Sequence, residues 1–168
     1  YSPDGSLIAW ESMERDGYES DKVRLFTYDF DTGKIENHSI EFDQNAHSLA
    51  WNENGTVIYF TSECHGTIEI YYLDLDDNMI SKLTDGIHNY RSIATSGGML
   101  ITTRQSMSMP TEIYSVNPQD GEAKQISSVN TDLLEQLTMG QVEKRWIKTT
   151  DNKNMLVWYI YPPHFDPE

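Results

Sequence analysis

Few side chains in this sequence are of the types that carry out chemistry. The five histidines are scattered, without the His-x-x-x-His or His–Glu spacing of metal ligands; they are His38, His47, His65, His88 and His164. We interpret them as ordinary surface or turn residues. Cys64-His65 is the one adjacent pair of soft ligands, but neighbours on a strand point to opposite faces, which disfavours shared ligation. A structural or solvent-facing thiol is the better interpretation.

Two acidic clusters suggest calcium until their spacing is counted. They are Asp29-x-Asp31-x-Gly33 and Asp74-x-Asp76-Asp77. A calcium loop of the EF-hand type needs Gly at its sixth position and Glu at its twelfth, where this chain has Lys34 and Ile40. Acidic residues in hairpin turns explain both clusters. We therefore predict no metal and no cofactor.

Aromatic side chains could line a channel for peptides. The candidates are Trp10, Trp51, Tyr59, Phe60 and Tyr72. Packing between sheets is the favoured interpretation, because aromatic residues dominate protein cores. The sequence therefore assigns no catalytic residue and leaves the substrate-binding residues unknown.

Composition limits the function classes. The chain has 168 residues, with 12 Lys and Arg against 27 Asp and Glu, so its formal charge is −15. This charge argues against nucleic-acid binding and against docking on an anionic membrane. It could steer substrates with a positive amino terminus, but solubility is the favoured explanation. No run approaches the roughly 18 apolar residues that span a bilayer, and a start without Met predicts a piece of a longer protein.

The most informative feature is an internal repeat of about 45 residues. Ser2–Trp10 recurs as Asn52–Phe60, with Gly5 and Gly55 50 residues apart, and a degraded copy covers Thr95–Thr102. Each copy is a polar turn that ends on Gly and leads into a short apolar run. A tight turn followed by a buried strand has this pattern, because Gly accepts a positive φ.

A second series of segments keeps the same order. These are β-branched and aromatic runs that end in Asp, Asn or Gly turns, at residues 23–33, 68–78 and 112–121. A short polar strand follows each one, at 34–42, 79–84 and 122–127, and further strands precede the second and third glycine turns, at 47–51 and 90–94. Four strands at this period are typical of a β-propeller blade.

The predicted fold class is therefore all-β, a partial β-propeller of about three four-stranded antiparallel blades at residues 1–44, 45–86 and 87–129. Closed propellers need four to eight blades, so we expect the rest of the ring to lie outside this chain. Residues 130–141 form a linker with a short helix, capped by Asn130 or Thr131. Residues 142–168 form a β-hairpin that opens a second domain.

The motifs together resemble a known family. The Ser-Pro-Asp-Gly-x-x-Ile-Ala turn at 2–9 is similar to blade motifs of TolB-type propellers and of S9 (prolyl oligopeptidase-like) serine peptidases. The tail resembles the S9 junction between propeller and α/β-hydrolase domain: Leu133-Leu134-x-x-Leu137, Glu143-x-x-Trp146-Ile147-Lys148-Thr149-Thr150-Asp151-x-Lys153-x-Met155-Leu156-Val157-Trp158, and Tyr161-Pro162-Pro163-x-Phe165-Asp166-Pro167. Bacterial dipeptidyl aminopeptidases of the IV and V kinds are the nearest in pattern.

This resemblance implies a parent serine exopeptidase that cleaves short peptides by acyl transfer, with the propeller controlling access. The sequence contains no Gly-x-Ser-x-Gly nucleophile motif, so no triad residue is carried over and the chain alone is expected to be inactive. The paired-glutamate motif of dipeptidyl peptidase IV relatives is absent too. The resemblance also suggests a periplasmic or otherwise extracytoplasmic location.

Two further hypotheses stay open at this level. The chain could belong to a TolB-like propeller without catalytic activity, which binds a protein partner as a scaffold. Exposed end blades could also make the chain associate with itself. The downstream coding sequence separates peptidase from scaffold, because only a peptidase needs the nucleophile motif there.

Overall fold

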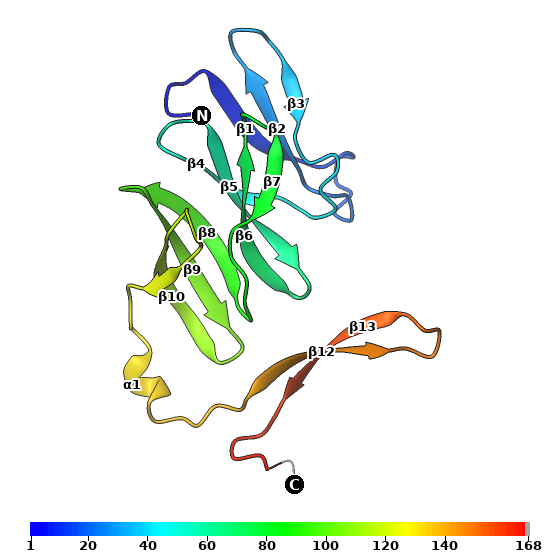
Figure 1. The fold of residues 1–168 in the computed structure, drawn as a ribbon, viewed down its shortest axis with the longest axis vertical. Coiled ribbons are helices and arrows are strands. Elements are labelled where there is room, and N and C mark those ends of the chain that lie inside the picture. The colour runs from blue at the N-terminus through cyan, green and yellow to red at the C-terminus, as the bar shows by residue number, and fades with distance from the viewer. Residues whose placement is uncertain (167–168) are drawn as a thin grey trace.

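Strands make up almost all of the regular structure in the computed structural model, which describes residues 1–166 (Figure 1). This confirms the all-β prediction. Pro167 and the last residue of the predicted 142–168 segment lie outside the described residues. The division into domains at 129 and 141 stays a prediction.

The first unit is an antiparallel sheet of three strands, β1 (Leu7–Ser12), β2 (Arg24–Asp29) and β3 (Ile35–Asn37), in the order β1-β2-β3. The unit has three strands and not the predicted four; residues 47–51, predicted as part of the second unit, pair within that unit. The loop between β1 and β2 is closed by an ion pair between Arg15 and Asp21.

The second and third units each contain four antiparallel strands. The second comprises β4 (His47–Trp51), β5 (Val57–Cys64), β6 (Thr67–Asp74) and β7 (Met79–Lys82), and the third comprises β8 (Asn89–Ser96), β9 (Met99–Ser106), β10 (Met109–Val116) and β11 (Ala123–Gln125). One parallel pairing, Ile68 with Asn89, joins β6 to β8 and links the two units into one sheet. Along most of their length the two units diverge, as Figure 1 shows.

The glycine turns lie where the repeat predicts them. Gly5, Gly55 and Gly98 precede β1, β5 and β9, with φ of 77°, 73° and 74°. An L-residue with a side chain is strained at such a φ, and this explains why the same residue type recurs at the three corners.

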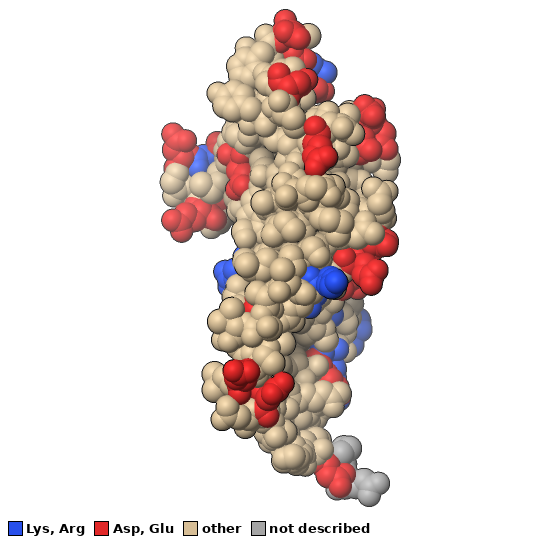
Figure 2. All heavy atoms as spheres, turned by 90° about the vertical axis from the view of Figure 1, so that its left-hand side faces the viewer, with Lys and Arg blue, Asp and Glu red and all other residues tan. Residues whose placement is uncertain are grey.

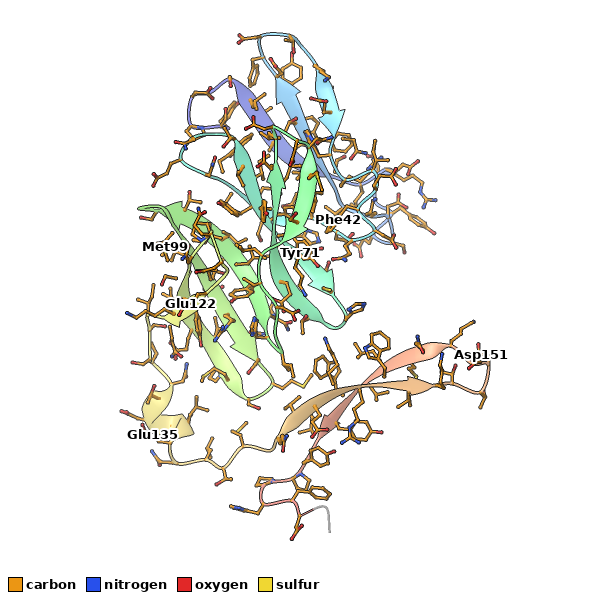
Figure 3. All side chains as sticks on the ribbon, viewed as in Figure 1. Phe42, Tyr71, Met99, Glu122, Glu135 and Asp151 are labelled. Carbon is orange, nitrogen blue, oxygen red and sulfur yellow. The ribbon has the colours of Figure 1, made fainter. Side chains whose placement is uncertain are left out.

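Packing between consecutive units forms two cores. One contains Leu25 of the first unit with Ile58, Phe60 and Leu73 of the second, and the other joins Ile70 to residues of the third. The rings of Phe42 and Tyr71, labelled in Figure 3, meet edge-on with centroids 5.3 Å apart. The sheets are thus held together by faces that stack on one another, as sheets do in layered β folds.

A hydroxyl group recurs at the end of the last strand of each unit. Ser39, Thr84 and Ser127 accept hydrogen bonds from the backbone N–H groups of Leu25, Ile70 and Ile113, at 2.9, 2.9 and 2.8 Å. These N–H groups lie where the outer strand leaves the ladder, so the side chain replaces a lost backbone acceptor.

Residues 130–141 contain one short helix, α1 (Thr131–Leu134). The predicted side-chain cap is wrong. Asn130 occupies the N-cap position, but its side chain forms no capping hydrogen bond. Nδ2 of this side chain donates to Glu112 Oε1 at 3.0 Å. The helix is thereby fastened to the third unit.

The chain ends in a separate hairpin of β12 (Val142–Lys148) and β13 (Asn154–Ile160), as predicted for this segment. It contacts the turn between β5 and β6. The ring of Trp146 meets His65 edge-on at 5.4 Å, and a Cβ placed on Gly66 would lie 3.0 Å from Nε1 of Trp158. The absence of a side chain at Gly66 therefore allows the hairpin to approach.

Among the charged residues on the face shown in Figure 2, Asp and Glu are spread along the molecule, and a smaller group of Lys and Arg lies near the middle. Within residues 1–166, no helix is long and apolar enough to cross a membrane.

Candidate functional site

The junction between the second and third units holds an unusual set of buried polar groups. A cavity of about 260 Å³ opens beside it, which we call the Arg104 cavity. Its lining residues come from the β7–β8 connection, from the ends of β9 and β10 that meet at their turn, and from the middle of β10: Ile87, His88, Arg104, Gln105, Ser106, Met109 and Tyr114.

Glu69 of β6 lies behind this cavity and is completely buried. Its Oε2 accepts a hydrogen bond from Oγ1 of Thr84 at 2.7 Å and lies 3.5 Å from Nε2 of His88. Among the described residues, Glu69 Oε1 and His88 Nε2 have no hydrogen-bond partner. A buried carboxylate oxygen without a donor is costly, so the Glu69–His88 pair is the least satisfied polar group of this junction.

The third unit has a glutamate at the equivalent position, and both of its carboxylate oxygens accept hydrogen bonds. Glu112 corresponds to Glu69 in the repeat; it accepts hydrogen bonds from the Ser127 hydroxyl and from both nitrogen atoms of Asn130. The Ser127 hydrogen bond, followed by those of Asn130, lowers the pKa of Glu112 from 4.5 to about 2. Glu112 is therefore a structural carboxylate, and the contrast identifies Glu69 as the exception.

Arg104 lies in the cavity between two tyrosines. Its guanidinium carbon is 3.7 Å from the ring centroid of Tyr114 and 5.9 Å from that of Tyr90. Burial raises the pKa of Tyr90, and its hydrogen bond to Arg104 acts in the opposite direction. Stacking fixes the plane of the guanidinium, so its N–H edge keeps a defined direction.

The histidines of the sequence analysis lie at separate places. His38 bridges two units through Thr27 and Asn78, while His47 forms an ion pair with Glu11 at 3.0 Å. His164 lines a second cavity, of about 370 Å³, at the base of the terminal hairpin. Only His88 reaches the Arg104 cavity. Within residues 1–166, no three potential metal ligands come together.

Cys64 and His65 differ from the prediction that they point apart. His65 lies in the turn after β5 with φ of 50°, so strand alternation does not apply to it. Its Nδ1 lies 3.7 Å from the Cys64 sulfur. The thiol also faces the hydroxyl of Tyr71, whose pKa is raised first by burial and then by its hydrogen bond to Cys64. The half-buried thiol belongs to the packing of the first core.

The acidic clusters lie in turns. Asp29 Oδ1 accepts the backbone N–H groups of Asp31 and Thr32 at 2.8 and 2.9 Å, and Asp74 Oδ1 accepts that of Asp76 at 2.9 Å. Their carboxylates thus stabilise hairpin turns, as the turn interpretation requires.

The aromatic candidates are found in packing contacts. Phe60 is fully buried in one core and Tyr59 is buried in the other, with Trp51 and Tyr72 against these cores. Trp10 stacks on Phe26 with centroids 5.4 Å apart. Of the five, Tyr59 alone borders a cavity, a small one of about 190 Å³ between the second and third units.

Sequence reasoning missed Glu69, Arg104 and the tyrosines around it. Alignment of the repeats contains part of the signal, since Glu69 and Glu112 share a position that Arg24 occupies in the first unit. Nothing in the repeat marks Arg104, because its partners come from β8 and β10 and meet it only through sheet pairing.

Comparison with known proteins gives the family. No family model matches the chain. The chain is 40% identical over 166 residues to dipeptidyl-peptidase 5 of Porphyromonas gingivalis, covering 99% of this chain and 24% of that protein. For dipeptidyl-peptidase 5 of Porphyromonas endodontalis the identity is 39%, with the same coverage. The chain thus spans about a quarter of the length of these curated relatives.

Solved structures share the fold. An acylaminoacyl peptidase in complex with Z-Gly-Gly-Phe-chloromethyl ketone superimposes with a TM-score of 0.77 at 21% identity, covering 98% of this chain and 25% of that one. The β-propeller domain of the Trilobed protease from Pyrococcus furiosus gives 0.60 at 20% identity, covering 76% and 36%. TolB from Acinetobacter baumannii gives 0.59 at 22% identity, covering 77% and 31%.

The stacked antiparallel units are therefore part of a β-propeller, and the chain belongs to the S9 (prolyl oligopeptidase) family of serine peptidases. Within that family, its sequence is similar to dipeptidyl-peptidase 5. The family resemblance and the propeller prediction are both confirmed.

Proposed function

We propose that the full-length protein containing this chain is a serine-type dipeptidyl peptidase that cleaves short peptides by acyl transfer. The observation that carries this proposal is the 40% identity to dipeptidyl-peptidase 5 along essentially the whole chain, hairpin included. This chain contributes propeller units that limit access to short, unfolded peptides, and residues outside it supply the Ser-His-Asp triad. Its segments are propeller at 1–129, linker at 130–141 and the first hydrolase hairpin from 142.

The scaffold alternative explains less of the chain. The TolB structure covers 77% of the chain, whereas the acylaminoacyl peptidase covers 98% and so must include β12 and β13. A terminal hairpin that superimposes together with the propeller units is thus a feature shared with the peptidase. This difference favours the peptidase over a binding scaffold.

Hydrolysis by the purified full-length protein tests the proposal. We expect release of a chromophore from dipeptides with a free amino terminus and none from the same dipeptides after amino-terminal acetylation. Activity on the acetylated series alone would instead indicate an acylaminoacyl peptidase, and activity on neither would contradict the proposal.

A serine-directed fluorophosphonate probe gives an independent readout. It should label the full-length protein but not the 168-residue chain expressed alone. Labelling of the chain would contradict the placement of the triad outside it.

Self-association of the chain through its end sheets is tested by light scattering on the same sample. A strict monomer at high concentration would exclude it.

A further inference from the structure

Two polar side chains of the Arg104 cavity, those of Gln105 and Ser106, accept hydrogen bonds from neighbouring residues and keep their donors free. Oε1 of Gln105 accepts the Thr111 hydroxyl at 3.0 Å, so its amide N–H groups are left for another partner. The Ser106 hydroxyl oxygen accepts the backbone N–H of Ser108 at 3.2 Å, so its proton is likewise available. A cavity with surplus donors is complementary to a ligand that supplies acceptors.

Arg104 adds a positive charge to these donors. In a chain with 27 acidic residues, Arg104 forms no ion pair among the residues that the structure describes. Its guanidinium face is covered by the Tyr114 ring, which is itself held by a hydrogen bond from the Tyr114 hydroxyl to Oε1 of Gln125 at 3.0 Å. Arg104 also hydrogen-bonds Tyr90. Because stacking uses the face of the guanidinium and not its edge, the other in-plane N–H donors are available to a planar two-oxygen acceptor such as a carboxylate.

Size and position restrict what can bind. At about 260 Å³, the cavity is smaller than the roughly 300–1,000 Å³ typical of sites that enclose a whole ligand. Its Ser106 and Met109 flank the β9–β10 turn, at the same end of the sheets as the β5–β6 turn that contacts the terminal hairpin (Figure 1). The cavity therefore fits the end of a longer molecule that lies along this end of the propeller.

We propose that the Arg104 cavity binds the carboxylate of a peptide, with the C-terminal carboxylate as the first candidate and an acidic side chain as the second source of the same chemistry. Arg104 supplies the charged donor edge, and Gln105 and Ser106 supply neutral donors beside it. His88 forms one wall and is backed by the buried Glu69. This inference rests on the proposed function only for the identity of the ligand as a peptide.

Peptide binding to the full-length protein tests the site, by titration calorimetry with a tetrapeptide as free acid, as C-terminal amide, and as an amide ending in Glu. We expect the free acid to bind about tenfold more tightly than the amide, which is the size of one charge-assisted hydrogen bond. Arg104→Gln should remove this preference, and Arg104→Lys should keep part of it, since a point charge lacks the planar edge. If the Glu-ending amide binds as tightly as the free acid and depends on Arg104, the side chain is the source.

Arg24→Gln is the matched control, because Arg24 also lies over an aromatic ring, Phe26 at 5.2 Å, but lines none of the cavities described above. Its preference for the free acid should equal that of the wild type. Equal binding of acid and amide by the wild type would overturn the proposal. This is the result expected if an acidic residue from elsewhere in the protein already occupies the site. A preference that survives in a folded Arg104→Gln variant would overturn it too. Hydrolysis of the chromogenic dipeptides is measured in parallel, so loss of the carboxylate preference is distinguishable from absence of peptidase activity.

Discussion

At the scale of single residues, the two equivalent glutamates show how neighbours set the role of a side chain. Glu69 and Glu112 are both buried on the third strand of a unit, and each accepts a hydrogen bond from a hydroxyl group just after the following strand. Only Glu112 receives further donors, from Asn130 of the linker. Both carboxylate oxygens of Glu112 thus accept hydrogen bonds, whereas Oε1 of the equivalent Glu69 has no donor among the residues that the structure describes.

The lowered pKa of Glu112 predicts a pH dependence of stability. A carboxylate whose folded-state pKa is about 2, below its ordinary 4.5, stabilises the fold fully above pH 4.5 and loses that contribution as the pH falls toward 2. Ser127→Ala removes the largest cause of the shift. We expect this variant to be less stable than wild type at neutral pH, by a margin that narrows between about pH 5 and pH 2.

Urea unfolding midpoints over that pH range measure the effect. Ser127→Thr is the control, because Thr84 shows that threonine serves at the equivalent position. A margin that stays constant with pH would show that Ser127 acts only through its hydrogen bond with the Ile113 N–H.

At the scale of elements, each unit ends on a hydroxyl that completes the ladder. Thr84 accepts the Ile70 N–H and donates to Glu69, and it is 6% exposed. Water therefore cannot easily replace it. The outer strands β3, β7 and β11 are short, and these side chains take over where backbone pairing stops.

Thr84→Ala is accordingly expected to destabilise the fold by about 1–3 kcal/mol, since it leaves a buried N–H and a buried carboxylate oxygen without a partner. Thr84→Ser keeps the hydroxyl and should cost clearly less. Chemical denaturation of both variants provides the comparison, and equal losses would indicate that the methyl group of Thr84 matters more than its hydroxyl.

At the scale of the whole molecule, the terminal hairpin is held against the propeller by two tryptophans. Trp146 contacts His65, and Trp158 lies over Gly66. Between the hairpin and the third unit, the chain passes through α1 and an extended linker (Figure 1). The position of the hairpin therefore depends on these side-chain contacts.

Trp158→Ala should release the hairpin without unfolding the propeller units. We expect limited proteolysis within residues 135–141 to accelerate several-fold, because a loosened segment is more accessible. Tyr159→Ala is the control on the same strand, since successive residues of a strand face opposite sides. Equal cleavage rates in wild type and Trp158→Ala would show that the hairpin is held in another way.

The sequence predicted much of the fold because a repeat reports local structure several times. Each repeat has a glycine that favours a turn, at Gly5, Gly55 and Gly98, and the apolar run after it favours a buried strand. Two predictions were wrong. The side chain of Asn130 bonds to Glu112, which is distant in the chain, and does not cap the helix. His65 lies in the turn after β5 and not on the strand, so its ring turns toward Cys64.

By itself, the sequence determined the strands, their corners, their period and the family, because turn propensity and alternation of apolar residues act over a few residues. Tertiary structure alone decided that Oε1 of Glu69 lacks a donor among the described residues, that His88 lies beside Glu69 and that Arg104 is stacked on Tyr114. Those arrangements depend on how successive sheets twist and pack, and packing joins residues that no local pattern connects.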